Sequence, residues 1–170
     1  MLNVVTLCTG NAARSVIAGA VLDDVGGLVV ITRGTHVVEG LPMSWRTRDA
    51  IHGLGVTTDG HHSRQLTAED LDDADVVLAM AREHVQYVRR RHPEAAARTG
   101  TLKRLARDLP LQDGPLEVRV AALGLADVEL EEWEDVDDPA GGEADVFQQC
   151  ANEIHALLAP ITSLLRGDAA

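Results

Sequence analysis

The chain has 170 residues, of which 45% are hydrophobic, and its formal net charge is −12. A chain of this length can bury one sizeable core and hardly two, so we expect a single domain over residues 1–170. The negative charge argues against a nucleic-acid partner, because affinity for a phosphate backbone depends on clustered Lys and Arg side chains.

Hydrophobic patterning predicts strands that alternate with helices along the chain. We expect strands at 2–7, 28–32, 75–80 and 99–102. We expect helices at 15–24, 46–54, 67–72, 82–92, 103–109, 115–123 and 144–166. This order is typical of a parallel sheet covered on both faces, so the predicted fold is α/β, with three αβα layers around a four-stranded parallel sheet.

The first predicted strand leads into the segment Cys8–Ser15, which reads Cys-Thr-Gly-Asn-Ala-Ala-Arg-Ser and precedes a helix-like stretch. A short loop that feeds a helix turns consecutive backbone N–H groups inward, and the helix N-terminus adds the positive end of its dipole. Such a loop binds a tetrahedral oxyanion. The expected phosphate-binding residues are Thr9, Gly10, Asn11, Ala12, Ala13, Arg14 and Ser15.

Several side chains of this loop suit nucleophilic chemistry on a bound phosphate. The field of the loop would favour the thiolate of Cys8, and the planar fork of Arg14 can hold two oxygens of the anion. Gly10 would let the loop approach the anion, Asn11 tolerates left-handed backbone angles, and Ser15 would donate a hydrogen bond to the thiolate. The alternative is that Cys8 is a small buried hydrophobic residue. The preceding strand and following helix favour the anion site.

The eight residues fit the pattern C-x-G-N-x-x-R-S, and here the chain resembles the low molecular weight protein tyrosine phosphatases, whose active-site loop also lies near the N-terminus. The resemblance extends to about residue 165, except for the unmatched stretch Leu111–Glu134. The other matching segments are Gly34–Thr35, Gly40–Pro42, Arg46, His61–Thr67, Asp75–Met80 and Val136–Pro139. The resemblance implies a protein tyrosine phosphatase that forms a phosphocysteine intermediate and needs no cofactor.

Phosphoryl transfer to Cys8 also needs an acid that protonates the leaving group on the opposite side. The acidic run Asp127–Asp138 offers several carboxylates, most of which we expect on a solvated face. The resemblance points to Asp138, because Pro139 completes the family's Asp-Pro motif and keeps the carboxyl out of a helix. The other candidates are Glu134, Asp135 and Asp137, of which Asp137 is the second choice.

His61 has two interpretations. Taken alone, it is an ordinary surface or half-buried histidine, whereas the resemblance implies that it hydrogen-bonds Asn11 and supports the loop together with Ser15. Thr32 is a candidate for the same network. The adjacent pair His61–His62 is not spaced for shared ligation and no Cys-x-x-Cys occurs, so we expect no metal site.

The residues after the Asp-Pro motif depart from the family. Most members carry aromatic residues there that line the phosphotyrosine cleft, whereas this chain has Ala140–Gly142. We therefore expect weaker phosphotyrosine affinity or a wider pocket, unless Trp45 or Trp133 substitutes. Ala12 replaces the threonine of the related protein-arginine phosphatases, which argues against phosphoarginine.

Three rival functions share features of this site. An arsenate reductase would have to use an external thiol, because Cys150 is the only other cysteine and has the spacing of a core residue. A cysteine-phosphorylated subunit of sugar transport and a phosphoprotein-binding module are the others, and the set of Cys8, Arg14 and Asp138 argues against both. The expected partner is a phosphotyrosine-containing protein or a small phosphomonoester.

The expected location is the cytoplasm, without a membrane partner. No run of about 18 apolar residues is present, and no charged-then-apolar leader precedes Val4. Two cysteines far apart, one of them needed as a thiolate, also argue against a disulfide-stabilised secreted protein. The sequence makes no prediction of oligomeric state.

Overall fold

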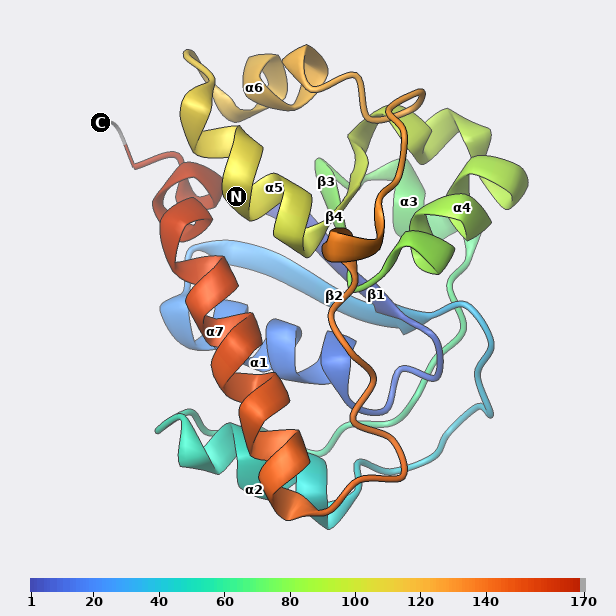
Figure 1. Ribbon diagram of the computed structural model, residues 1–170, viewed down its shortest axis with the longest axis vertical. Helices are drawn as coiled ribbons and strands as arrows, with labels where there is room; N and C mark the ends of the chain where they lie inside the picture. Colours follow the sequence, from blue (N-terminus) through green and yellow to red (C-terminus); the bar gives the residue numbers. More distant parts are fainter. Residues whose placement is uncertain (169–170) are drawn as a thin grey trace.

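The computed structural model describes residues 1–168 (Figure 1). The strands are β1 (Leu2–Cys8), β2 (Leu28–Gly34), β3 (Val76–Ala79) and β4 (Thr99–Thr101). The α-helices are α1 (Arg14–Val25), α2 (Trp45–Gly53), α3 (Ala68–Asp72), α4 (Arg82–Arg91), α5 (Leu102–Asp108), α6 (Leu116–Ala122) and α7 (Ala144–Arg166). Every predicted strand and helix is present, with ends that differ by one or two residues. Three short 3-10 turns that were not predicted are η1 (Pro93–Arg98), η2 (Leu109–Leu111) and η3 (Glu132–Glu134).

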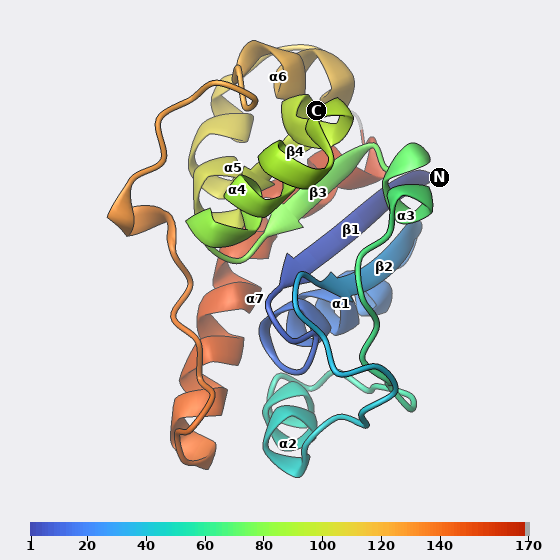
Figure 2. The same ribbon diagram turned by 90° about the vertical axis from the view of Figure 1, so that its right-hand side faces the viewer.

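The strands form one parallel sheet in the order β2-β1-β3-β4. Figures 1 and 2 show the three layers, with α1, α5 and α7 on one face of the sheet and α3 and α4 on the other. The predicted α/β fold with a four-stranded parallel sheet is therefore confirmed. Its central strand is β1, which pairs with β2 from Leu2 to Cys8 and with β3 from Val4 to Leu7.

Side chains of β1 point alternately into two apolar clusters. Val4 belongs to the cluster formed with α1, α5 and α7, whereas Val5 and Leu7 belong to the cluster formed with α3 and α4. A parallel sheet buried on both faces has near-continuous apolar strands, which explains why residues 2–7 show no simple alternation of polar and apolar residues. The double burial fixes the carboxyl end of β1, where Cys8 lies.

The loop after β1 lies at the point where the order in which the chain adds strands to the sheet reverses. The chain passes from β1 to β2 on one side of it and reaches β3 on the other, so the connections diverge beyond the carboxyl end of β1. Ligands of open α/β sheets bind in the crevice at such a point. Figure 2 shows the loop that follows the β1 arrow and leads into α1.

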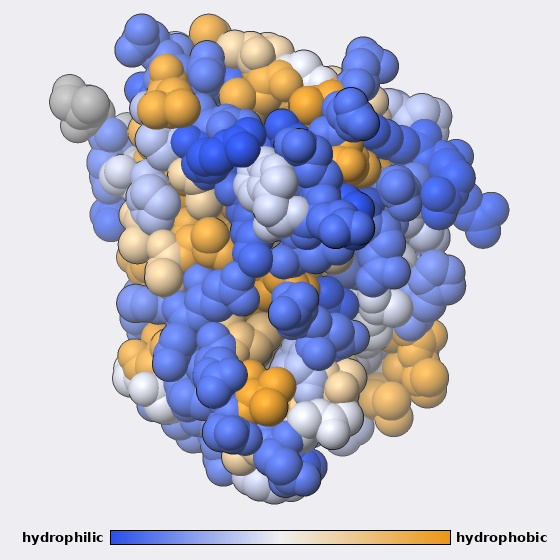
Figure 3. Space-filling view, viewed as in Figure 1, coloured by the Kyte–Doolittle hydropathy of each residue, from blue (hydrophilic) through white to orange (hydrophobic). Residues whose placement is uncertain are grey.

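Polar side chains cover most of one face of the molecule (Figure 3). On the face drawn in Figure 3, hydrophilic side chains predominate and hydrophobic ones form separate patches. Of the helices within residues 1–168, none has the length and apolar character needed to cross a membrane.

Candidate active site

Cys8 and Ser15 begin and end the segment Cys8–Ser15, which we call the phosphate loop. Both side chains are buried, and Cys8 Sγ lies 3.0 Å from Ser15 Oγ. Asn11 Nδ2 donates to the same Ser15 oxygen at 2.9 Å. Because this bond uses Ser15 Oγ as an acceptor, the hydroxyl hydrogen is free to point at the sulfur. The predicted Ser15-to-Cys8 hydrogen bond therefore has the required geometry.

Asn11 anchors the middle of the phosphate loop. Its φ of 51° lies in the left-handed region, as we expected for this residue. Its side-chain amide donates to Thr32 Oγ1 at 3.1 Å and accepts from the backbone N–H of Arg64 at 2.8 Å. Its backbone carbonyl accepts from His61 Nε2 and from Ser63 Oγ, both at 2.8 Å. Strand β2 and the segment 61–64, both distant in sequence, thus hold one residue in an uncommon conformation.

The predicted contact between His61 and Asn11 is present, although it reaches the backbone carbonyl rather than the side chain. Burial lowers the pKa of His61, while the hydrogen bond to Asn11 opposes the shift. A neutral imidazole with its proton on Nε2 satisfies this bond. The contacts of Ser63 and Arg64 were not predicted, although both residues belong to the His61–Thr67 segment that carries the family resemblance.

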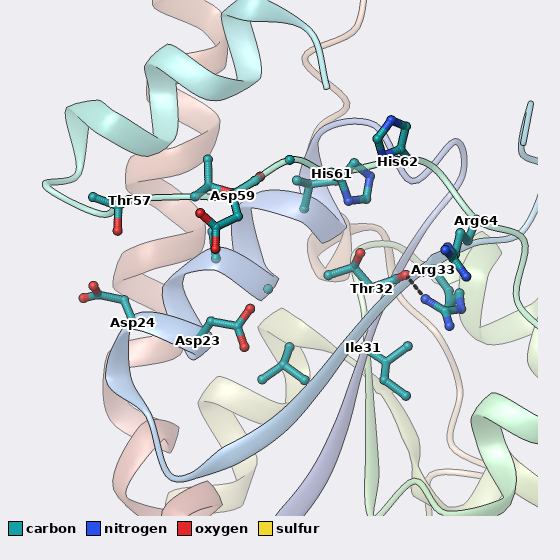
Figure 4. A pocket seen from close by; sticks show the side chains of 16 residues that line it. Asp23, Asp24, Ile31, Thr32, Arg33, Thr57, Asp59, His61, His62 and Arg64 are labelled. Carbon is teal, nitrogen blue, oxygen red and sulfur yellow. Dashed lines mark hydrogen bonds between the residues drawn. The ribbon is translucent and has the colours of Figure 1, made fainter. Parts of the chain in front are cut away.

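A cavity of about 710 Å³ is lined by three of the residues that bind Asn11, namely Thr32, His61 and Arg64. Figure 4 shows Asp59 and His61 at its upper side, Asp23 and Asp24 of α1 at one end, and Arg33 and Arg64 at the other. Its lining residues come from α1, β2 and residues 57–64, and they include neither end of the phosphate loop. This cavity is therefore separate from the site that contains Cys8.

Arg14 is the first residue of α1 and is held in place from across the site. Its side chain is buried, and Nη1 donates to the carbonyl oxygen of Val136 at 2.9 Å. Its Nη2 lies 3.4 Å from Asp138 Oδ2. The residue predicted to grip the phosphate and the residue predicted to be the acid thus form an ion pair.

A second cavity, of about 630 Å³, brings together the three predicted catalytic residues Cys8, Arg14 and Asp138. Its floor also contains Thr9, Gly10, Ala12 and Ala13, as predicted for phosphate-binding residues. The predicted phosphate-binding residues Asn11 and Ser15 are absent from this lining, because their side chains point behind the loop. The walls come from the starts of α2 and α7 and consist of Ser44, Arg46, Thr47, Ala140, Gly141, Gly142, Glu143 and Phe147.

The aromatic content of this cavity is low. Phe147 is the aromatic residue among the lining residues, and neither Trp45 nor Trp133 is one of them. The ring of Trp133 instead packs against Arg107, whose guanidinium carbon lies 4.1 Å from the ring centroid. The possible substitution by a tryptophan is therefore not realised in this structure.

Asp138 and its neighbour Asp137 differ in their surroundings. The Asp138 side chain is 51% exposed, and its Oδ1 accepts a hydrogen bond from the backbone N–H of Ala140 at 3.0 Å. Asp137 accepts through its backbone carbonyl from the thiol of Cys150 at 3.9 Å. Burial raises the pKa of Cys150 to about 12, so this thiol is a poor nucleophile. Asp138 lines the cavity that contains Cys8, whereas Asp137 does not.

Glu134 is an exception in the acidic run, most of which we expected on a solvated face. This residue is fully buried, and its carboxylate accepts from Arg104 Nε and Nη2, both at 2.7 Å, and from Thr101 Oγ1 at 2.8 Å. Burial alone would raise the pKa of Glu134, but these hydrogen bonds outweigh it and lower the pKa. A buried carboxylate is tolerated here because it is paired and fully hydrogen-bonded.

Sequence reasoning also missed a support for Thr9. His84 is fully buried, and its Nδ1 accepts from the backbone N–H of Ala81 at 3.0 Å, so its proton is on Nε2. That Nε2 lies 2.8 Å from Thr9 Oγ1, whose hydroxyl in turn donates to Glu83 Oε1 at 3.3 Å. Burial, aided by the charge of Arg14, lowers the pKa of His84 to about 3. His84 is therefore neutral and ties the phosphate loop to α4.

Gly34, at the end of β2, is the glycine that permits close approach of the loop. A Cβ there would lie 2.5 Å from the carbonyl oxygen of Thr9 and 2.8 Å from the backbone nitrogen of Asn11. A Cβ on Gly10 would meet nothing nearer than Ala12 Cβ at 4.0 Å, so the contacts of the loop with the rest of the protein do not require a glycine there. The predicted role of Gly10, close approach to a bound anion, stays a prediction.

Comparison with known proteins identifies the family. The family model described as low molecular weight phosphotyrosine protein phosphatase matches residues 3–118. A protein-arginine-phosphatase of Geobacillus stearothermophilus is 30% identical over 154 residues, covering 89% of this chain and 88% of the relative. The low molecular weight protein-tyrosine-phosphatase Etp of Escherichia coli is 34% identical over 98 residues, covering 57% of this chain and 66% of the relative.

The solved structures agree with these relatives. An arginine phosphatase from Geobacillus stearothermophilus superposes with a TM-score of 0.78 at 28% identity, over 99% of this chain and 95% of that one. Within residues 1–168, no group of three His, Cys, Asp or Glu side chains is arranged to hold a metal ion. The resemblance found in the sequence is confirmed, and the chain belongs to the low molecular weight phosphotyrosine protein phosphatase family.

Proposed function

We propose that this chain is a protein tyrosine phosphatase in which Cys8 is the nucleophile, Arg14 holds the phosphoryl group and Asp138 is the general acid. The observation that carries the proposal is the single cavity lined by all three residues, with Arg14 Nη2 3.4 Å from Asp138 Oδ2. The family supports a cysteine-dependent phosphatase, and two residues far apart in sequence meet Cys8 in one cavity.

In the first step, the thiolate of Cys8 attacks phosphorus in line with the leaving group. The S–P bond forms as the P–O bond to the leaving group breaks, and protonated Asp138 transfers its proton to the departing oxygen. Arg14 and the backbone N–H groups of the phosphate loop hold the equatorial oxygens. The products are phosphocysteine at Cys8 and a neutral alcohol or phenol.

In the second step, water cleaves the phosphocysteine. Asp138, now a carboxylate, accepts a proton from the water as the water oxygen attacks phosphorus and the S–P bond breaks. The thiolate of Cys8 leaves with a hydrogen bond from Ser15, which lies 3.0 Å away. Inorganic phosphate dissociates, and Asp138 is again protonated for the next turnover.

The supporting roles follow from the contacts of the loop. Asn11 keeps the loop in its left-handed turn through Thr32, Ser63 and Arg64, and His61 contributes a further bond to its carbonyl. These residues fix the direction of the loop N–H groups without touching the substrate. Preorganised donors of this kind need no reorganisation when charge develops on the phosphoryl oxygens.

Arginine phosphatase activity is the second candidate. The protein-arginine-phosphatase of Geobacillus stearothermophilus matches nearly the whole chain, whereas Etp matches little more than half of it. The cavity wall has the carboxylates of Asp138 and Glu143 and few aromatic atoms, which suits a cationic guanidinium leaving group. Ala12, in place of a threonine, is the observation against it.

Arsenate reduction with an external thiol is a weaker candidate. Cys150 is buried with a raised pKa, so it is unsuited to resolving an adduct on Cys8. A phosphoprotein-binding module would need no general acid, so it would not account for the carboxylate of Asp138 beside Arg14. The proposed partner is a phosphotyrosine protein or a small phosphomonoester, and the cytoplasmic location stays a prediction.

A substrate panel tests the proposal. Phosphotyrosine, phosphoserine and phosphoarginine peptides, together with thiol-dependent arsenate reduction, are assayed on the wild type and on Cys8→Ser. We expect the highest kcat/KM on the phosphotyrosine peptide and no turnover by Cys8→Ser. Preference for phosphoarginine would select the second candidate, and near-normal turnover by Cys8→Ser would overturn the mechanism.

A further inference from the structure

Asp138 is carried by a long connection that needs external support. Between α6 and α7 the chain runs over residues 123–143, where η3 is the one helical segment. Figures 1 and 2 show this connection passing beside α4 on its way to the start of α7. A side chain on such a segment has a fixed position only where neighbouring residues hold the backbone.

The backbone is held just before Asp138. The N–H of Val136 donates to the carbonyl of Met80 at 2.8 Å, and the carbonyl of Val136 accepts from Arg14 at 2.9 Å. Beyond Val136, Asp138 is half-exposed. The orientation of Asp138 is therefore decided by how residues 134–136 are fixed to the rest of the protein.

Asp135 makes the densest set of polar contacts next to Val136. Its carboxylate accepts from the backbone N–H of Arg82 at 2.8 Å, from Nε at 3.2 Å to each oxygen, and from Nη2 at 2.9 Å. Arg82 is the first residue of α4 and closely follows β3, so it is rigidly attached to the sheet. The pair spans 53 positions of sequence and joins the acid-bearing connection to the sheet.

The charge state of the pair is stable. Burial alone would raise the pKa of Asp135, but the hydrogen bonds from Arg82 outweigh it and lower the pKa. A bidentate arginine–carboxylate pair also fixes geometry, because both groups are planar. Asp135 and Arg82 line a cavity of about 510 Å³ that shares Arg14 and Asp138 with the cavity that contains Cys8.

We propose that Asp135, clamped by Arg82, is a positioning residue that aims Asp138 at the leaving-group oxygen. The inference rests on the proposed function, in which Asp138 gives its proton to that oxygen as the P–O bond breaks. Asp135 itself touches neither substrate nor the reacting atoms. Its loss would leave the nucleophile and the phosphate loop in place and impair proton transfer alone.

Leaving-group dependence separates this role from a general structural one. p-Nitrophenol leaves readily as an anion, whereas phenol, with a pKa near 10 like the tyrosine side chain, depends strongly on protonation. We expect Asp135→Ala to lower kcat/KM on phenyl phosphate by about 10- to 100-fold. On p-nitrophenyl phosphate we expect little change, and inhibition by inorganic phosphate should keep its wild-type constant.

Four further variants complete the experiment. Lys103→Gln is the matched control, because it breaks the Lys103–Glu153 ion pair, 2.7 Å long and similarly part-exposed, between α5 and α7. Asp138→Asn should show the same leaving-group selectivity as Asp135→Ala, only larger, and adding Asp135→Ala to it should have no further selective effect. If Asp135→Ala does not fold, Arg82→Gln carries the test, because it keeps the backbone bond to Asp135.

Each contrary result has a distinct meaning. Four results would each overturn the positioning role. They are equal losses of kcat/KM on the two phenyl esters, no loss on either ester, weaker inhibition by phosphate, and a selective loss that persists in the Asp138→Asn background. A lack of leaving-group selectivity in Asp138→Asn itself would instead contradict the choice of acid in the proposed function. The two failures are therefore distinguishable.

Discussion

Asp138 is the residue whose replacement separates binding from chemistry. Its side chain is half-exposed and contacts the rest of the protein through Arg14 and the N–H of Ala140, so the fold and the phosphate loop do not depend on it. We expect Asp138→Ala to lower kcat on a phosphotyrosine peptide by on the order of 10²- to 10⁴-fold, because the leaving group loses its acid. Inhibition by inorganic phosphate should be largely retained.

Asp137→Ala is the matched control for this prediction. Asp137 is the neighbouring carboxylate, and its recorded contact is made through its backbone carbonyl, which the substitution keeps. A larger loss of kcat in Asp137→Ala than in Asp138→Ala would show that the acid is Asp137.

Gly34 tests how closely β2 must approach the phosphate loop. In Gly34→Ala the new methyl group would meet the backbone of Thr9 and Asn11 within 3 Å, so the loop must shift. We expect about 1–3 kcal/mol of destabilisation and weaker inhibition by phosphate, measured by urea unfolding and by initial rates. Gly60→Ala is the control, because open space surrounds its Cβ position. Wild-type phosphate inhibition in Gly34→Ala would contradict the steric account.

At the scale of elements, the connection that carries Asp138 is fixed by two arginine–carboxylate pairs. The buried Glu134 would lose its partner in Arg104→Met, which leaves an unpaired charge in the interior. We expect a loss of about 3–5 kcal/mol in the free energy of unfolding by urea. For the part-exposed pair of Lys103 with Glu153 we expect a loss of only about 0–1 kcal/mol in Lys103→Met.

A double replacement checks the cause of that loss. Changing Glu134 to Leu together with Arg104→Met removes both charges and should recover part of the stability. If the double variant is less stable than Arg104→Met, the loss comes from packing and not from the unpaired carboxylate.

The phosphate loop could be predicted from the sequence because its determinants are contiguous. The strand, the loop and the helix follow one another from Leu2 to Val25, and the nucleophile and Arg14 lie within them. The capping box of Thr67 and Asp70 at the start of α3 is local in the same way, because its two residues are three positions apart.

Apart from His61 and Thr32, which the family resemblance indicated, the supports of the site could not be predicted, because they depend on distant contacts. Asp135 and Arg82 are 53 positions apart, and Glu134 and Arg104 are 30 apart. In sequence, Glu134 and Asp135 are two more charges in an acidic run, and nothing local tells a buried carboxylate from a solvated one. His84 likewise carries no sequence signal of its bond to Thr9, and the short 3-10 turns have too few residues to show a period.

At the scale of the whole molecule, His84 makes stability depend on pH. Its pKa is about 3 in the folded protein and about 6.5 when unfolded, so the unfolded chain binds more protons between these values. The contribution of neutral His84 to the free energy of unfolding is fully present above pH 6.5. It is lost as the pH falls toward 3, at about 1 kcal/mol per pH unit. The charged or titratable groups that face His84 are Arg14, His36, Glu83 and Asp135.

Urea unfolding at pH 7, 6 and 5 measures this dependence. We expect the free energy of unfolding to fall toward pH 5 in the wild type and to fall less steeply in His84→Gln. His61, whose pKa is also lowered, contributes in the same direction and remains in both proteins. Equal slopes in the two proteins would contradict the account of His84. A single cooperative transition would in addition support the predicted single domain over residues 1–170.

The most direct test of the whole account is detection of the phosphocysteine. The wild type is mixed with p-nitrophenyl phosphate, quenched within milliseconds and digested. The mass of the peptide that contains Cys8 is then measured by mass spectrometry. We predict one added phosphoryl group on Cys8 in the wild type, and neither that adduct nor turnover in Cys8→Ala. A phosphoryl group on another residue, or steady turnover by Cys8→Ala, would contradict it.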